Sequence, residues 1–139
     1  YYLDAAIPND SNSFLASSLR NSTDPMNATG SGKAMLAYMP EEFVEDFLSK
    51  PMTALTEYTI TDPEQMRTEL QKIRMQGYSV DNMENSIGLK CVAVPILTRK
   101  GQLVGAMSVS GPSLRFTEEK IRHFIEVLQN HLVLMQQSL

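Results

Sequence analysis

The sequence has a single cysteine, Cys91, among its 139 residues. One cysteine excludes an internal disulfide and any metal site built from several cysteines, and it is consistent with a reducing cytosol. The sequence also lacks an apolar run of about 20 residues, the length that crosses a bilayer, and it lacks a signal-peptide pattern. We therefore expect a cytoplasmic protein with no membrane partner.

Basic residues are too few and too scattered for a nucleic-acid surface. The chain has 12 Lys and Arg against 16 Asp and Glu, which gives a net charge of -4 without any acidic block. Proteins that bind DNA or RNA usually neutralise the phosphates with clustered Lys and Arg. We expect no direct contact between this chain and nucleic acid. Its length and its 42% hydrophobic content indicate one globular domain over residues 1–139.

Hydrophobic periodicity and turn residues divide the chain into short elements. Strands or extended segments are expected at 1–7, 14–20, 52–60, 78–82, 90–97 and 102–110. Helices are expected at 32–39, 41–48, 62–77 and 117–139. The strands and helices alternate without the regular rhythm of a parallel sheet, so the pattern predicts an α+β domain with an antiparallel sheet and helices packed on it.

The helix expected at 62–77 has the clearest boundaries. Asp62 is suited to the N-cap, Pro63 to the first helical position, Gln65 to a capping box and Gly77 to the end. Its buried stripe is predicted to contain Met66, Leu70 and Ile73. Thr117 is expected to cap the last helix, whose apolar stripe comprises Ile121, Phe124, Ile125, Leu128, Leu132, Met135 and Leu139.

The segment GSGK at residues 30–33 resembles part of a phosphate-binding loop. Asn27 and Ala34 stand where that loop needs a glycine and a hydroxyl, so a nucleotide site is rejected. Gly30, Ser31 and Gly32 still allow close backbone approach at a helix N-terminus, where free N–H groups favour a small anion. A plain turn with glycine for its local geometry is the alternative, and both interpretations stay open.

The hairpin expected from 90 to 110 separates small side chains from large ones. A symmetric turn at 98–101 predicts that Leu97 faces Gln102, Cys91 faces Ser108 and Ala93 faces Ala106. Alternation then places Cys91, Ala93, Ala106, Ser108 and Ser110 on one face. The other face has Val92, Val94, Ile96, Leu103, Met107 and Val109. The face of small residues either lets a helix pack unusually close or leaves a hollow for a polar ligand.

Residues with reactive side chains form no catalytic arrangement. Lys90 should point away from Cys91, and the eight-residue spacing of His123 and His131 does not suit a metal pair on a helix. A buried, inert thiol is therefore favoured over a nucleophile. Asp81 and Glu84 form no evident acid/base pair, and both are interpreted by default as polar loop residues.

Asp81 has a second interpretation. It ends the strand expected at 78–82, from which its carboxylate can reach the face of small residues. There it could accept hydrogen bonds from the hydroxyl groups of a ligand.

The order of three longer segments is distinctive: NATGSGKAMLAYMPEE, then LTEYTITD, then IRMQGYSVDNMENSIGLKCVAVPILTRKGQLVGAMSVSGP. From about Pro25 to the C-terminus the chain resembles the effector-binding domain of bacterial IclR-family transcriptional regulators, a GAF-like module. The elements GY..D..E...G..C.A.P and S.SGP, in this order, carry the resemblance.

The resemblance implies a sensor of a small organic acid, without catalysis, cofactor or metal. It implies a GAF-like antiparallel sheet flanked by helices. The pocket residues carried over by motif are Gly30, Ser31, Asp81, Leu89, Cys91, Ser108 and Ser110. Most of these belong to the face of small residues or to the glycine-flanked helix start identified above.

The chain also departs from the family pattern. Nothing in it resembles the family's N-terminal winged helix-turn-helix, so DNA binding is expected only through a domain outside this chain. A helix and a strand ahead of YYLD are also missing, and an edge left uncovered favours association, so a homodimer or homotetramer is expected. Two alternative functions remain: a GAF-like thiol redox enzyme that uses Cys91, and a dimerisation scaffold without a ligand.

Overall fold

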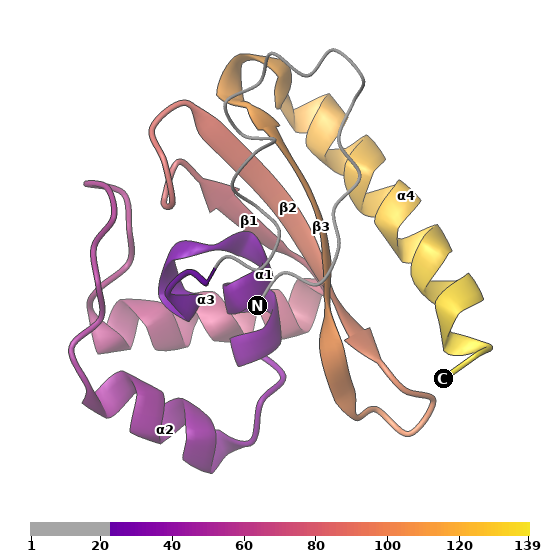
Figure 1. Ribbon diagram of the computed structural model, residues 1–139, viewed down its shortest axis with the longest axis horizontal. Helices are drawn as coiled ribbons and strands as arrows, with labels where there is room; N and C mark the ends of the chain where they lie inside the picture. The colour runs from indigo at the N-terminus through magenta and orange to yellow at the C-terminus, as the bar shows by residue number, and fades with distance from the viewer. Residues whose placement is uncertain (1–22) are drawn as a thin grey trace.

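The computed structural model describes residues 23–139 of the chain (Figure 1). The helices are α1 (Gly30–Leu36), α2 (Glu41–Ser49), α3 (Pro63–Gln76) and α4 (Glu118–Gln136), with short 3₁₀ turns η1 (Met26–Ala28) and η2 (Ser113–Arg115). The strands are β1 (Ser79–Asn82), β2 (Leu89–Leu97) and β3 (Leu103–Pro112). The α+β class is confirmed. The strands expected at 1–7 and 14–20 lie outside the described residues.

The three strands form one antiparallel sheet in the order β1-β2-β3. Across β1, β2 and β3 the paired residues form two neighbouring rows, Asp81–Cys91–Ser110 and Ser79–Ala93–Ser108. Side chains in both rows point to the same face of the sheet, because neighbouring residues in one row align across strands and alternate residues along a strand share a face.

The predicted register of the hairpin is wrong by two residues. Cys91 pairs with Ser110 instead of Ser108, and Ala93 pairs with Ser108 instead of Ala106. The turn is not symmetric: a bulge-like irregularity lies between Ile96 and Leu97, and Leu97 pairs with Leu103 instead of Gln102. From Gly105 to Ser110 the shift is even, so the predicted division of side chains between the two faces is preserved there. Leu103 is the exception, because it pairs with Leu97 beyond the irregularity and so leaves the predicted face of large residues.

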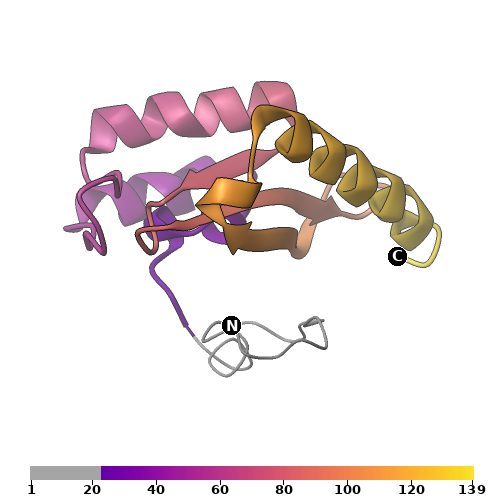
Figure 2. The same cartoon turned by 90° about the horizontal axis from the view of Figure 1, so that it is seen from above.

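The two faces of the sheet are covered by different helices (Figures 1 and 2). Helix α4 packs on the face of large residues, and the C-terminus lies just beyond it. The buried residues of this layer are Val92, Val94, Phe116, Ile125 and Leu128. Helix α1 packs on the face of small residues and joins α2 and α3 in a second apolar core, formed by Leu36, Ala37, Leu48, Ile60, Met66, Leu70 and Ile73.

The predicted boundaries of α3 are confirmed. The Asp62 carboxylate accepts the N–H of Gln65 at 2.8 Å, and Gly77 ends the helix with φ of 84°. The side chain of Thr117 caps α4 in the same way, by accepting the N–H of Lys120. Both helices therefore begin at residues whose side chains satisfy free backbone donors.

The prediction of an extended segment at 52–60 is wrong. The backbone there forms turns and bends. The Thr59 hydroxyl accepts the N–H groups of Leu55 and Thr56, and it donates to the carbonyl of Glu84 at 2.6 Å. A side chain that satisfies nearby backbone donors stabilises a turn at the expense of a strand, so the β-branched composition misled the prediction.

None of the helices in residues 23–139 combines the length and the apolar character that a membrane crossing requires.

Candidate functional site

The start of α1 is built by Thr29 and two glycines. The Thr29 hydroxyl caps the helix by accepting the N–H of Gly32 at 2.8 Å. A Cβ at Gly32 would lie 2.4 Å from the carbonyl oxygen of Met26, so only glycine fits there. The N–H groups of Gly30 and Ser31 have no acceptor among residues 23–139. Within the described part of the chain these two donors are unpaired, as are the donors that hold anions at other helix starts.

Gly30 brings α1 very close to the sheet. A Cβ at Gly30 would lie 3.0 Å from the sulfur of Cys91 and 3.5 Å from the Cβ of Ala93. The Ser79 hydroxyl donates to the Gly30 carbonyl and fixes the helix on β1. Of the two interpretations of the small face, close packing is therefore correct over Cys91 and Ala93.

The same face is less covered toward β3. Ser108 is half-buried and Ser110 is exposed, whereas Cys91 and Ala93 in the same rows are buried. Leu89 is half-buried and lies two residues before Cys91 on the same face of β2. The structure thus brings all the predicted residues of the sheet onto one face and places Gly30 over its centre.

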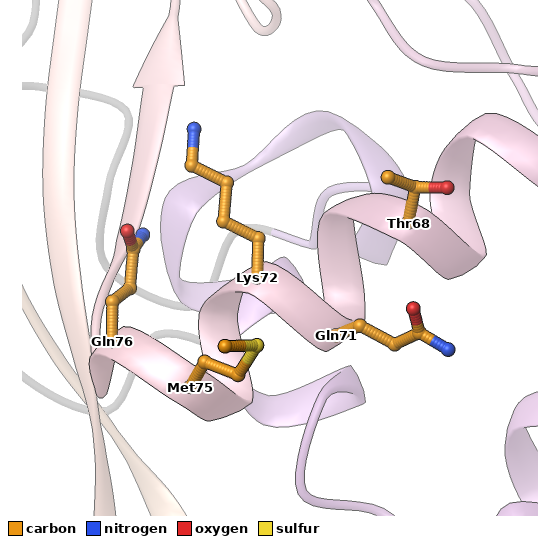
Figure 3. Close-up of a pocket in the computed structure, with 5 residues that line it drawn as sticks. All are labelled: Thr68, Gln71, Lys72, Met75 and Gln76. Carbon is orange, nitrogen blue, oxygen red and sulfur yellow. The ribbon is translucent and has the colours of Figure 1, made fainter.

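A surface depression lies elsewhere, on the outer side of α3 (Figure 3). It is lined by Thr68, Gln71, Lys72, Met75 and Gln76. All of its lining residues come from one helix, and none of them belongs to the predicted site. The side chain of Met75 is 89% exposed there. The depression is open to solvent and brings no side chains from different elements together, so it does not define a binding site.

Cys91 is an unreactive thiol in this environment. It is only 6% exposed, and its S–H donates to the Val92 carbonyl at 3.6 Å. Burial raises the pKa of the Cys91 thiol to about 11, while the nearby hydroxyls of Ser110 and Ser108 act in the opposite direction. The thiolate needed for redox chemistry is therefore scarce at neutral pH.

Asp81 is a buried carboxyl group in the same row. It is 2% exposed, and its Oδ1 accepts the N–H of Glu84 at 2.7 Å. Burial raises the pKa of Asp81 to about 6; the charge of Glu84 acts in the same direction, and that of Lys33 opposes it. Asp81 therefore changes charge close to physiological pH.

Lys33 lies at the centre of a buried charged cluster that the sequence analysis did not predict. Its side chain is 1% exposed. The ammonium lies 2.8 Å from Oε1 of Glu84 and 3.2 Å from Oε1 of Glu69, and it donates to the Val80 carbonyl at 2.8 Å. One side chain therefore links α1 to α3, to β1 and to the loop after β1.

The interpretation of Glu84 as an ordinary polar loop residue is wrong. Glu84 is 6% exposed, and its Oε2 accepts the N–H of Asn82 at 2.9 Å. The sequence contained a signal for this cluster: Lys33 lies three and four residues before the apolar Leu36 and Ala37, which places it on the buried stripe of α1. A lysine on such a stripe needs a buried acidic partner.

The described residues contain no group of three or more His, Cys, Asp or Glu side chains arranged to hold a metal ion. The arrangement consists instead of helix-start amides, hydroxyl groups and a buried carboxyl group around one sheet face. Donors and acceptors of this kind are the groups with which proteins orient small polar ligands.

Comparisons with known proteins identify the family. The family model described as "Bacterial transcriptional regulator IclR C-terminal" matches residues 12–132. The chain therefore belongs to this family and is an IclR-type effector-binding domain, which confirms the resemblance drawn from the sequence. The Escherichia coli HTH-type transcriptional regulator KdgR is 37% identical over 106 residues, which cover 76% of this chain and 40% of KdgR.

Solved structures agree with this assignment. The Thermotoga maritima IclR structure has a TM-score of 0.77 and 40% sequence identity, covering 81% of this chain and 46% of that one. The inducer-binding domain of PobR from Acinetobacter has a TM-score of 0.82 at 22% identity, covering 94% of this chain and 77% of that one, and it shows the shared fold alone. The chain spans about two fifths of the length of the curated relatives it matches. These relatives are transcriptional regulators and not enzymes.

Removal of the buried ammonium is expected to destabilise the domain strongly. The substitution Lys33→Met leaves Glu84 with a buried, uncompensated carboxylate and the Val80 carbonyl without its donor. We expect the free energy of unfolding to fall by about 3–5 kcal/mol, measured by urea denaturation followed by circular dichroism. Lys50→Met is the matched control, because Lys50 is 69% exposed in its pair with Asp46. The control should change stability by less than about 1 kcal/mol. Equal stability of both variants would contradict the assigned role of Lys33.

The Cys91 thiol is expected to react slowly with iodoacetamide at pH 7.5. Its buried position and raised pKa reduce both access and the thiolate fraction. Mass spectrometry over time should show alkylation at least about 100-fold slower in the native protein than in the same protein unfolded in urea. A native rate equal to or above the unfolded rate would restore the redox alternative.

Proposed function

We propose that this chain is the sensor of a transcriptional regulator and binds a small organic acid or sugar acid that modulates DNA binding by the full-length protein. The observation that supports this most directly is the packing of the start of α1, at Gly30, on the sheet face that carries Ser108 and Ser110. Amide and hydroxyl donors from separate elements suit a carboxylate group.

The proposed ligand position follows from the packing. Because Gly30 covers Cys91 closely, the carboxylate lies beside the start of α1, on the less covered side toward Ser108 and Ser110. Leu89 supplies apolar contact, and Cys91 forms the buried floor. Asp81 contacts hydroxyl groups of the ligand or bound water.

One protein of the same fold is known with a ligand of the proposed class. The PobR structure is described as a complex of an inducer-binding domain with 3-hydroxybenzoic acid. That ligand belongs to PobR, which is only 22% identical to this chain. For this chain we propose the broader class of small carboxylates, without a cofactor and without catalysis.

The regulatory step is a shift between two arrangements of the full-length protein. An effector that binds one arrangement more tightly increases its population and so changes operator affinity. In this proposal residues 1–139 form one cytoplasmic domain, DNA contacts come from a winged helix-turn-helix outside the chain, and the domain assembles as a homodimer or homotetramer. The buried thiol with its raised pKa disfavours the alternative of a Cys91 redox enzyme.

Calorimetric titration with 2-oxo acids, sugar acids and hydroxybenzoates tests this function. We expect at least one class to bind, and the double variant Ser108→Ala/Ser110→Ala to weaken its binding by about 10-fold or more, because two hydrogen bonds to a charged group are lost. The matched control is Ser86→Ala/Ser138→Ala, whose serines are exposed and lie outside the sheet face. The control should bind like the wild type.

Two results would count against the proposal. Unchanged affinity in the Ser108/Ser110 variant would exclude the proposed pocket. If no acid of the panel binds or raises the melting temperature, the ligand-free scaffold is the better description, since a ligand that binds the native state must stabilise it.

A further inference from the structure

Carboxyl groups outnumber ammonium groups near Asp81. The Lys33 ammonium is paired with the buried Glu84 and with Glu69, which is 23% exposed, and the buried Asp81 lies close enough to feel the charges of Lys33 and Glu84. They come from β1, the loop after it, α3 and α1, and Cys91 faces Asp81 from β2. One ammonium that is already shared with Glu69 cannot fully compensate two buried ionised carboxyl groups.

Asp81 is the carboxyl group with the least compensation. The Lys33 ammonium lies 2.8 Å from Glu84 and 3.2 Å from Glu69, and it donates to the Val80 carbonyl. Asp81 instead relies on backbone N–H groups, with the N–H of Glu84 at 2.7 Å. If the cluster takes up a proton, the proton therefore goes to Asp81. Its pKa, raised to about 6 by burial, is consistent with this.

Asp81 also lies next to the proposed ligand position. It is the cross-strand partner of Cys91, and the sulfur of Cys91 lies 3.0 Å from where a Gly30 Cβ would stand. Adjacent strands are about 4.8 Å apart, so a carboxylate at the Gly30 and Ser31 amides adds a negative charge within about 10 Å of Asp81. A like charge at this distance from a buried carboxyl group favours the protonated form of that group.

We propose that a carboxylate effector binds to this domain together with one proton, which Asp81 takes up. This inference rests on the proposed function, because it assumes that the effector occupies the α1 start. The domain then binds the ionised carboxylate and, in the same step, one proton from solution. The affinity for the effector therefore depends on pH. Affinity falls as the pH rises above neutrality, because the proton must be supplied from an ever lower concentration.

Calorimetry in buffers of different ionisation enthalpy measures the proton uptake. The titrants are pyruvate, gluconate and 3-hydroxybenzoate, whose carboxylates are ionised from pH 5.5 to 8, and the protein is the full 139-residue chain. At pH 6.5 we expect uptake of about half a proton per bound ligand, for a pKa that moves from about 6 to above 7 on binding.

The Asp81→Asn variant should abolish this uptake. Asparagine keeps an oxygen that can accept the Glu84 N–H and carries no charge. At pH 7.5 the variant should bind the same acid up to about 10-fold more tightly than the wild type, with little pH dependence, because no proton is required. Asp46→Asn is the control, because Asp46 is exposed on α2, and it should retain the uptake of the wild type.

Stability measurements show independently whether Asp81 titrates as inferred. A folded-state pKa above the unfolded value of 3.8 means that Asp81 favours the native state at low pH. This contribution is lost as the pH rises through about 6. Between about pH 4 and 6 the wild type should lose stability as the pH rises, and Asp81→Asn should not show this loss. At pH 7.5 the variant should be at least as stable as the wild type.

The possible outcomes distinguish failure of this inference from failure of the proposed function on which it rests. Binding without proton uptake, or uptake that persists in Asp81→Asn and so arises from another group, would overturn the inference alone. A 10-fold weaker affinity of Asp81→Asn at pH 7.5 would also overturn it, since Asp81 would then act as an ionised acceptor. Absence of binding by all three acids would overturn the proposed function, and this inference with it.

Discussion

The buried ammonium of Lys33 is the constraint on which the arrangement of the small face depends. It is 1% exposed and joins α1 to Glu69 of α3, to the Val80 carbonyl of β1 and to Glu84 in the loop after β1. Desolvation of a lysine is costly, and that cost is offset only when its partners hold their geometry. The cluster therefore fixes the orientation of α1 on the sheet and, with it, the position of the helix start. Thr56 and Thr59 hold the same loop from the other side through the carbonyls of Met83 and Glu84.

Close packing and a ligand site are compatible because they involve different parts of one face. Gly30 approaches Cys91 and Ala93 so closely that no ligand fits between them. Their neighbours on β3, Ser110 and Ser108, are less covered. Small side chains on β2 thus let the start of α1 pack closely on the sheet, on the face that also carries Ser108 and Ser110. The features that stabilise the packing are those that, in our proposal, position the effector.

The sequence predicted what depends on local chemistry and on alternation along a strand. The caps of α3 and α4 were correct because Asp62 and Thr117 act within a few residues. The two faces of the hairpin were correct from Gly105 to Ser110, because an even shift preserves alternation. The register failed because the bulge near Ile96 has no evident residue signature. The Lys33 cluster was missed because its partners lie 36 and 51 positions away, where only the tertiary fold brings them together. The turn before Thr59 was missed because its hydroxyl accepts two nearby backbone N–H groups, which β-branched composition does not reveal.

The central claim is that a small carboxylate binds where the start of α1 meets the sheet. Amide chemical-shift mapping of ¹⁵N-labelled protein, titrated with the acid that binds most tightly, tests this directly. We predict that the largest changes occur at Gly30 and Ser31, followed by Ser108 and Ser110. Changes centred on the outer side of α3 around Met75, with the Gly30 and Ser31 resonances unmoved, would contradict the claim.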